Sequence, residues 1–394
     1  MKINRGSDLW HEIPCGQHFI PRVRRQNTDQ RRELAENENS LLNHPAFAHN
    51  ESPKTAKRIM KTPPPKSIPA YWPSLLCALL LIGNAVLARS ADLLEPGKPI
   101  VVAGTHGRFD FLAIDVVGRK LLAAHTGNKS LDVIDIDRKE VIKVLPTGAA
   151  QAPAIDSKGK RYFVTVSKPP QLVTVDSGTL EITGKVPLVG PPDLLAFNEK
   201  SGRVYAGHDD GKDLWVIDPD KSEVVATIDL PNDSPEDLGF DSSFQRLFRS
   251  MKTGGVVAVI DIATNKVIEN WPTAPVQTPH GMAMLPEAAA LLVAGGNGKL
   301  VMMSQKDGHV ITSVNIPARV DQLAYDPDLH RVYCASGTGR IAIVGTDARK
   351  LSNLGEVASS EGCHSIAVDP KTHTVWIAYA KGETSIVQPL TTMK

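Results

Sequence analysis

The chain has 394 residues, of which 42% are hydrophobic and 22% charged, and its net charge is +1. The charges are unevenly divided: residues 1–91 carry 13 Lys and Arg against 7 Asp and Glu, whereas residues 92–394 carry 31 against 36, a net of −5. The larger part is long enough to bury a sizeable core, and it lacks the basic surface by which proteins bind nucleic acids.

The first 66 residues form a polar N-terminal segment. The stretch from Arg22 to Asn39 is rich in Arg, Asn and Glu, a composition that predicts disorder or weak helicity. Met60 precedes Lys-Thr-Pro-Pro-Pro-Lys, which makes a normal start for a signal sequence. We therefore interpret Met60 as the start of translation and residues 1–59 as an over-extended gene prediction. The competing interpretation is a genuine cytoplasmic tail.

Residues 67–91 have the pattern of a signal peptide or a membrane anchor. Residues 74–88 form an uninterrupted, mostly apolar run, with Lys61 and Lys66 upstream and small residues suited to cleavage after Ala88 or Ser90. The run is shorter than the roughly 20 residues that a transmembrane helix needs. The pattern predicts a periplasmic or secreted protein, and an uncleaved signal would instead anchor the protein in the membrane.

From residue 92 onward the sequence is repetitive. One polar position recurs in steps of 41, 42, 43, 44, 41 and 43 residues, and we call its members the ring residues: Asp110, Gln151, Asp193, Glu236, His280, Asp321 and His364. Three positions after each ring residue the side chain is Ala or Gly, and the next one is apolar, which predicts a tightly packed inner strand. In most copies an Asp then begins a turn, because its carboxylate accepts hydrogen bonds from nearby backbone N–H groups.

Three further strands are expected in each repeat. Val-Ile-Asp phrases such as Val133–Asp135 and Val259–Asp261 end the third strand. Four strands per unit of about 40–45 residues are typical of a β-propeller blade. We therefore predict an all-β fold over residues 92–394, a seven-bladed β-propeller of four-stranded antiparallel blades.

The two ends of the repeat region are expected to meet. The last repeat has room for only three strands, whereas the strand-like segment Pro99–Gly104 precedes the first repeat. We predict that this N-terminal segment supplies the outer strand of the seventh blade and closes the ring, because closure removes an exposed sheet edge. The alternative is an open solenoid.

The expected second strands carry the phrases Arg161–Val166, Arg203–Gly207 and Arg331–Ala335. In these phrases and in its Val-Ile-Asp motifs, the chain resembles the bacterial YVTN-repeat (YncE-like) propellers from about residue 99 to 390. The resemblance implies the seven-bladed fold but no single activity, because propellers serve as enzymes, binders and scaffolds. Relatives have been associated with DNA binding, which the acidic net charge argues against. Repeats five to seven depart from the pattern, with Ser304, Gly345 and Gln388 where Asp is expected.

The ring residues are the candidate binding site. In a propeller, the loop into the innermost strand and the loop out of the second strand lie on one face, around the channel entrance. His125 and His208 follow the second strands of repeats one and three. We therefore predict a small molecule or protein partner at the entrance, bound by the ring residues with these two histidines, and we expect a monomer.

A divalent metal is one interpretation of this entrance. Imidazole and carboxylate groups suit zinc or manganese, and the candidate ligands are His280, Asp321 and His364. Ordered water with hydrogen bonds between blades, or an organic or peptide ligand, would also explain a polar entrance. A metal-assisted hydrolase or lactonase is the enzymatic alternative, and an assembly scaffold is a third class. The chain lacks the common nucleophile-elbow, phosphate-loop, haem-attachment and zinc-helix motifs, so no catalytic residue is predicted.

Only Cys334 and Cys363 follow the signal segment. They fall on neighbouring repeats, and an oxidising compartment would permit a disulfide between them. We favour two separate buried thiols.

Overall fold

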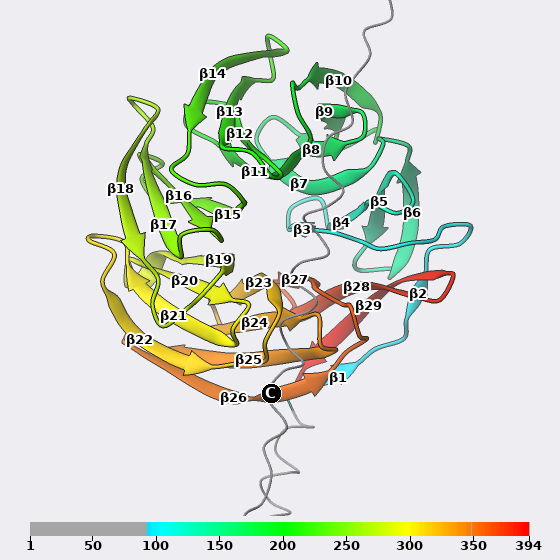
Figure 1. The fold of residues 1–394 in the computed structure, drawn as a ribbon. Coiled ribbons are helices and arrows are strands. Elements are labelled where there is room, and N and C mark those ends of the chain that lie inside the picture. Colours follow the sequence, from blue (N-terminus) through cyan, green and yellow to red (C-terminus); the bar gives the residue numbers. More distant parts are fainter. Residues whose placement is uncertain (1–92, 348, 394) are drawn as a thin grey trace, which may run out of the picture. The chain divides into compact units, whose positions relative to one another are not determined.

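The computed structural model describes residues 93–347 and 349–393. Their strands form seven antiparallel sheets that are arranged as blades around one axis (Figure 1), so the predicted propeller class is confirmed. Within this part of the chain the only helical element is a 3-10 turn at Pro286–Ala288, and no helix there is long and apolar enough to cross a membrane. The predicted segments 1–66 and 67–91 lie outside the described residues.

The first three blades follow one another along the chain, and the innermost strand of each comes first (Figure 1). Blade one consists of β3 (Leu112–Asp115), β4 (Lys120–His125), β5 (Ser130–Asp135) and β6 (Glu140–Leu145). Blade two consists of β7 (Ala150–Asp156), β8 (Arg161–Ser167), β9 (Pro170–Asp176) and β10 (Ile182–Pro187). Blade three consists of β11 (Pro192–Asn198), β12 (Arg203–His208), β13 (Asp213–Asp218) and β14 (Glu223–Asp229).

The next three blades repeat this order. Blade four consists of β15 (Pro235–Phe240), β16 (Arg246–Met251), β17 (Val256–Asp261) and β18 (Lys266–Pro272). Blade five consists of β19 (Pro279–Leu285), β20 (Ala290–Gly295), β21 (Lys299–Ser304) and β22 (Val310–Asn315). Blade six consists of β23 (Val320–Asp326), β24 (Arg331–Ser336), β25 (Arg340–Asp347) and β26 (Lys350–Ala358).

Blade seven combines both ends of the described chain. Its C-terminal strands are β27 (Ser365–Asp369), β28 (Thr374–Lys381) and β29 (Thr384–Thr392). Two short N-terminal strands, β1 (Leu94–Pro96) and β2 (Ile100–Val101), pair antiparallel with β29. The predicted segment Pro99–Gly104 thus contributes only β2, and β1 was not anticipated. That this pairing is what closes the ring stays a prediction.

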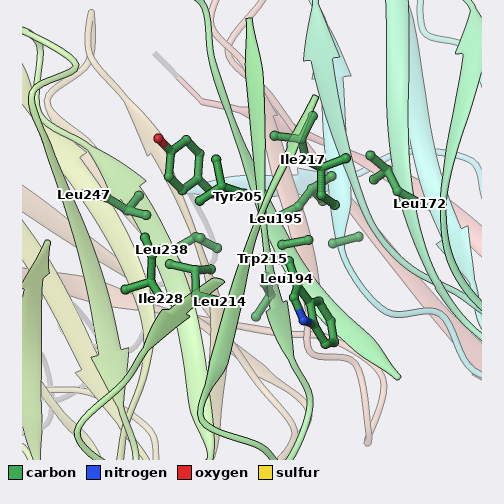
Figure 2. Close-up of a cluster of buried hydrophobic side chains, with 14 of the residues drawn as sticks. Leu172, Leu194, Leu195, Tyr205, Leu214, Trp215, Ile217, Ile228, Leu238 and Leu247 are labelled. Carbon is green, nitrogen blue, oxygen red and sulfur yellow. The ribbon is translucent and has the colours of Figure 1, made fainter. Parts of the chain in front are cut away.

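Apolar side chains between neighbouring blades form the core. Figure 2 shows one such cluster, in which Tyr205 and Trp215 of blade three pack with Leu172 of blade two and Leu238 of blade four. The apolar residues that alternate along β12 and β13 face blade two on one side and blade four on the other. Each blade is therefore stabilised by both of its neighbours.

The Asp residues of the first turns act both locally and between blades. Asp115 accepts a hydrogen bond from the N–H of Gly118 at 2.7 Å, as expected for a turn, and its second oxygen accepts one from the hydroxyl of Tyr162 in blade two at 2.7 Å. Asp369 of blade seven pairs in the same way with Arg119 of blade one, at 2.7 Å. The repeated carboxylate thus links successive blades, including the last to the first.

A side chain at the centre of the propeller also links the last and first blades. Gln322 of β23 accepts the N–H of Ile366 in blade seven at 2.9 Å, and its amide donates to the carbonyl of Leu112 in blade one at 3.1 Å. Gln322 is itself buried. One amide therefore satisfies backbone groups of both blades at the point where the ring closes.

The two cysteines are free and buried, in agreement with the favoured prediction. Burial raises the pKa of Cys334 beyond the physiological range and raises that of Cys363 to about 12. Both are therefore neutral thiols, which makes them poor nucleophiles.

The role of the N-terminal strands in closure can be tested at Leu94, which is 2% exposed in β1 and packs in the blade-seven core. We expect Leu94→Asp to lower the free energy of unfolding by about 2–5 kcal/mol, because a carboxylate replaces a buried apolar group. Urea denaturation followed by intrinsic fluorescence measures this change. Val117→Asp, at a position that is 81% exposed, is the matched control. Equal unfolding midpoints for Leu94→Asp and the wild type would show that β1 contributes nothing to closure.

Candidate functional site

The ring residues are presented by irregular backbone. In blades two to six, the register between the first two strands shifts at the ring position, for example between Pro235 and Leu238 and between Pro279 and Met282. The ring residue and its successor therefore lie in a β-bulge. Bulges redirect side chains and are frequent beside functional sites.

Hydrogen bonds between blades fix these bulges. Ser250 Oγ donates to the carbonyl of His280 at 2.6 Å. Asp237, the successor of a ring residue, accepts the N–H of Met282 in the next blade at 2.9 Å. Thr165 donates to the carbonyl of Asp193 in the same manner. The ring side chains thus extend from a backbone that the neighbouring blades hold in place.

The structure brings together three ring residues from blades four, five and six. His280 Nδ1 lies 3.3 Å from Glu236 Oε2 and 3.4 Å from Asp321 Oδ1. Burial opposes the charged form of His280, but the carboxylates of Asp321 and Glu236 outweigh it and raise its pKa to about 9. Lys252 holds the other oxygen of Glu236, Oε1, at 3.0 Å. At neutral pH the group therefore combines two carboxylates with two cations.

His364, a sequence-predicted metal candidate, lies beside this group but not within it. Its Nδ1 donates to the carbonyl of Gly362 at 2.9 Å, and its buried Nε2 has no hydrogen-bond partner among the described residues. His364 lines a pocket of about 270 Å³ together with His280, Asp321 and Arg319. Burial raises the pKa of Asp321, yet the nearby histidines and Lys252 more than offset this and keep it below its usual range. We call this cavity the entrance pocket.

Blades one and three supply carboxyl groups whose ionisation is opposed by burial. Asp110 is buried, and its nearest cation, Arg108, lies 3.7 Å away and is largely exposed. Burial raises the pKa of Asp110 to about 6 in spite of Arg108. Burial and the charges of Asp110 and Asp209 raise the pKa of Asp193 well above its usual range. The electrostatic coupling of Asp110 with Asp193 and Asp321 indicates that the ring residues gather around one entrance.

Gln151, the ring residue of blade two, offers no charge. Its side chain is buried, and its Oε1 has no hydrogen-bond partner among the described residues. Gln151 is therefore a neutral polar ring residue and does not belong to the group formed by Glu236, His280 and Asp321.

Arg249 is a buried cation that the sequence analysis overlooked. Six repeats carry an apolar side chain at its position in the second strand: Ala123, Val164, Ala206, Val293, Cys334 and Ile377. Arg249 is fully buried, and its three guanidinium nitrogens have no hydrogen-bond partner in the described part of the chain. It occupies space left by Gly207, where a Cβ atom would collide with the guanidinium. Burial lowers its pKa to about 10, although Asp193, Glu236 and Asp237 act in the opposite direction.

His125 does not line the entrance, which corrects its predicted placement. It is fully buried between blades one and seven, with Nδ1 2.7 Å from Asp132 and Nε2 3.0 Å from Ser385 Oγ. The order of groups resembles a Ser-His-Asp triad, but none of the three side chains has exposed surface. The chain of hydrogen bonds is therefore a structural link between the last and first blades.

His208 is only half-buried, yet it is engaged in its own loop. Its Nδ1 accepts the N–H of Gly211 at 2.7 Å, and its ring lies 5.4 Å from that of Trp215. The structure does not place it in the group formed by Glu236, His280 and Asp321. A histidine after a second strand is therefore a weaker sign of a site than a ring residue.

Comparison with known proteins agrees with this architecture. No protein-family profile matches the chain. The protein described as "Uncharacterized protein YncE" of Salmonella typhimurium is 28% identical over 149 residues, which is 38% of this chain and 37% of that protein. Over these residues the chain is similar to YncE. Because the match spans only 37% of YncE, it supports the relationship but transfers no activity.

Solved structures support the propeller fold. A chain of Kuenenia stuttgartiensis hydrazine synthase superposes with a TM-score of 0.62 at 16% identity, covering 72% of this chain and 98% of that one. The WD40 repeats of RRP9 superpose with a TM-score of 0.63 at 11% identity, covering 75% and 100%. Identities this low show the propeller fold alone.

The raised pKa of Asp110 predicts a pH-dependent stability. Between about pH 4 and 6, Asp110 ionises readily in the unfolded chain but reluctantly in the folded protein, so the wild type loses stability as the pH rises. The loss amounts to about 3 kcal/mol at most. Asp110→Asn removes it, so we expect the variant to gain stability over the wild type at pH 7.5 but little at pH 4.

Urea midpoints of Asp110→Asn and the wild type at the two pH values measure this difference. Asp137→Asn is the control, because Asp137 is exposed and Arg119 lowers its pKa, so no gain at pH 7.5 is expected. A constant difference between wild type and Asp110→Asn at both pH values would contradict the prediction.

Arg249 is expected to reduce stability. Replacing a buried charge that has no partner with an apolar side chain of similar volume is commonly stabilising by about 1–4 kcal/mol. We expect Arg249→Met to raise the free energy of unfolding by an amount in this range, measured by urea denaturation. Arg246→Met on the same strand, which loses an ion pair with Asp241 at 3.3 Å, should bring no gain. A less stable Arg249→Met variant would mean that the guanidinium is paired in solution.

Proposed function

We propose that the protein is an exported propeller that binds a small organic acid, as a carboxylate or phosphate ester, in the entrance pocket. One observation carries the proposal. The guanidinium of Arg319 and the unpartnered Nε2 of His364 line the same cavity, and no carboxylate of the described residues lies within ion-pair distance of Arg319. Guanidinium groups bind carboxylates and phosphates through two parallel hydrogen bonds.

The larger cavities are not lined by ring residues. A cavity of about 760 Å³ lies between residues 98–103 and strand β6, at the outer edge of the blades. A second cavity of about 410 Å³ is lined by Glu287 and His330, at turns between first and second strands, and by Asp347 at the end of β25, and none of these is a ring position. Binding residues commonly lie on loops above a rigid scaffold, and the entrance pocket is the cavity that the ring residues reach.

The export part of the proposal rests on the sequence pattern of residues 67–91. A cleaved signal would release the propeller to the periplasm or the medium, and an uncleaved one would tether it to the membrane. A protein partner at the same face is compatible with the proposal, because a partner can present an acidic side chain or a C-terminal carboxylate to Arg319.

Calorimetric titration with a panel of mono- and dicarboxylates and phosphate esters tests the proposal. We expect the wild type to bind at least one member, and Arg319→Gln to weaken that binding by about 10- to 100-fold, since a hydrogen bond to a charged group contributes roughly 1.5–3 kcal/mol. Arg340→Gln is the matched control, because Arg340 lies in the same blade and pairs with Glu356 at 3.4 Å. Absence of binding across the panel, or an equal loss in both variants, would refute the proposal.

A further inference from the structure

We propose that Glu236, His280 and Asp321 form a binding site for one divalent transition-metal ion, with zinc and manganese as the best-matched ions. The inference deepens the proposed binding function, because the entrance pocket shares two of these residues. His364 of the sequence-based trio is replaced by Glu236 in this set of ligands.

The distances from His280 to its two neighbouring carboxylates fit a shared metal ion. Zinc binds histidine nitrogen and carboxylate oxygen at about 2.0–2.2 Å. Two ligands of a tetrahedral ion with such bonds are separated by about 3.3–3.6 Å. The measured distances from His280 Nδ1 are 3.3 Å to Glu236 Oε2 and 3.4 Å to Asp321 Oδ1, and one atom of each residue lies within 4.8 Å of the others.

Hydrogen bonding alone explains the group poorly. His280 Nδ1 is buried, and neither carboxylate oxygen is aligned to form a hydrogen bond with it. A single N–H could serve only one of two carboxylates that lie at nearly equal distances. A cation at the common centre would instead contact all three atoms. A nitrogen with two oxygens is a ligand set that zinc, manganese and similar ions accept.

The surrounding residues hold the three ligands in place. Each ligand comes from a β-bulge of a different blade, and the bulge of His280 is fixed by the hydrogen bond from Ser250 and by the contact of Asp237 with Met282. Lys252 binds Glu236 Oε1, which leaves Oε2 directed to His280. Such supporting contacts orient metal ligands, and loss of one typically weakens metal binding or activity by about 10- to 100-fold.

Three protein ligands leave a coordination position open, as in metal sites that bind an exchangeable molecule. A metal ion would displace the Nδ1 proton of His280 to solvent. Two carboxylates and Lys252 would then leave the site with one net negative charge, so a divalent ion would make it positive by one. An anionic group in the entrance pocket would balance that charge. Arg319 and His364 would then position the remainder of the same molecule.

The full-length chain, stripped with a chelator and dialysed, can be titrated with zinc chloride and with manganese chloride by calorimetry. We expect one equivalent of at least one of these ions to bind. Glu236→Gln and Asp321→Asn should each weaken binding by at least about tenfold, the smallest effect typical of losing even a supporting group of a metal site. Thermal unfolding without metal checks that each variant is folded, and two separate variants guard against a folding defect in one.

His364→Gln and Arg319→Gln are the controls that separate the two proposals. Both should retain metal binding, whereas Arg319→Gln should weaken binding of the organic acid. Failure of the wild type to bind either ion, or binding that persists unchanged in Glu236→Gln and Asp321→Asn, would overturn the metal site and leave the organic-acid proposal intact. Metal binding without any organic acid would support the metal site and reject the proposed ligand.

Discussion

The ring of blades depends on the joint between blade seven and blade one. Neighbouring blades elsewhere are connected by the chain itself, but these two lie at opposite ends of it. Polar contacts hold them together at three levels: Gln322 at the centre, His125 with Ser385 in the middle, and Arg119 with Asp369 at the far turn. Because Gln322 and His125 are buried, water does not compete with their hydrogen bonds, and loss of one partner would leave the other unsatisfied.

Charged groups are unevenly distributed around the entrance. Blades one and three contribute Asp110 and Asp193, whose ionisation is opposed by burial and by each other. Blades four to six contribute His280, Lys252 and Arg319 alongside Glu236 and Asp321. A molecule that carries an acidic group would therefore meet favourable charge on one arc of the ring and unfavourable charge on the other. The binding position is expected to be off the propeller axis, near blades five to seven.

The fold could be predicted from the sequence because its determinants repeat. Each turn Asp, small residue and apolar strand appears several times, so a pattern is visible without knowledge of contacts. The site could be predicted only in part. The ring positions emerged from their periodicity, but which of them approach one another depends on the rotamers of Glu236, His280 and His364, and no spacing rule encodes these.

Residues that do not belong to the repeated pattern were harder to interpret. His125 looked like an entrance residue, because the sequence did not reveal that Asp132 and Ser385 would enclose it. Arg249 could have been found from the sequence, because it is the one charged residue at a second-strand position that is apolar in the other six repeats. No sequence pattern distinguished Arg319 and Lys252, because Lys and Arg side chains are common on any protein surface.

Because ring residues lie in β-bulges, the side chains that would bind a ligand are largely independent of those that determine the fold. A side chain on a regular strand must suit the pleat and the neighbouring blade, whereas a residue in a bulge is released from that alternation. Evolution can therefore alter the ring residues of blades two to six one at a time without reshaping the blades. A protein of this kind can acquire a new ligand through a few substitutions around the channel entrance. Relatives with the same scaffold therefore need not share a ligand.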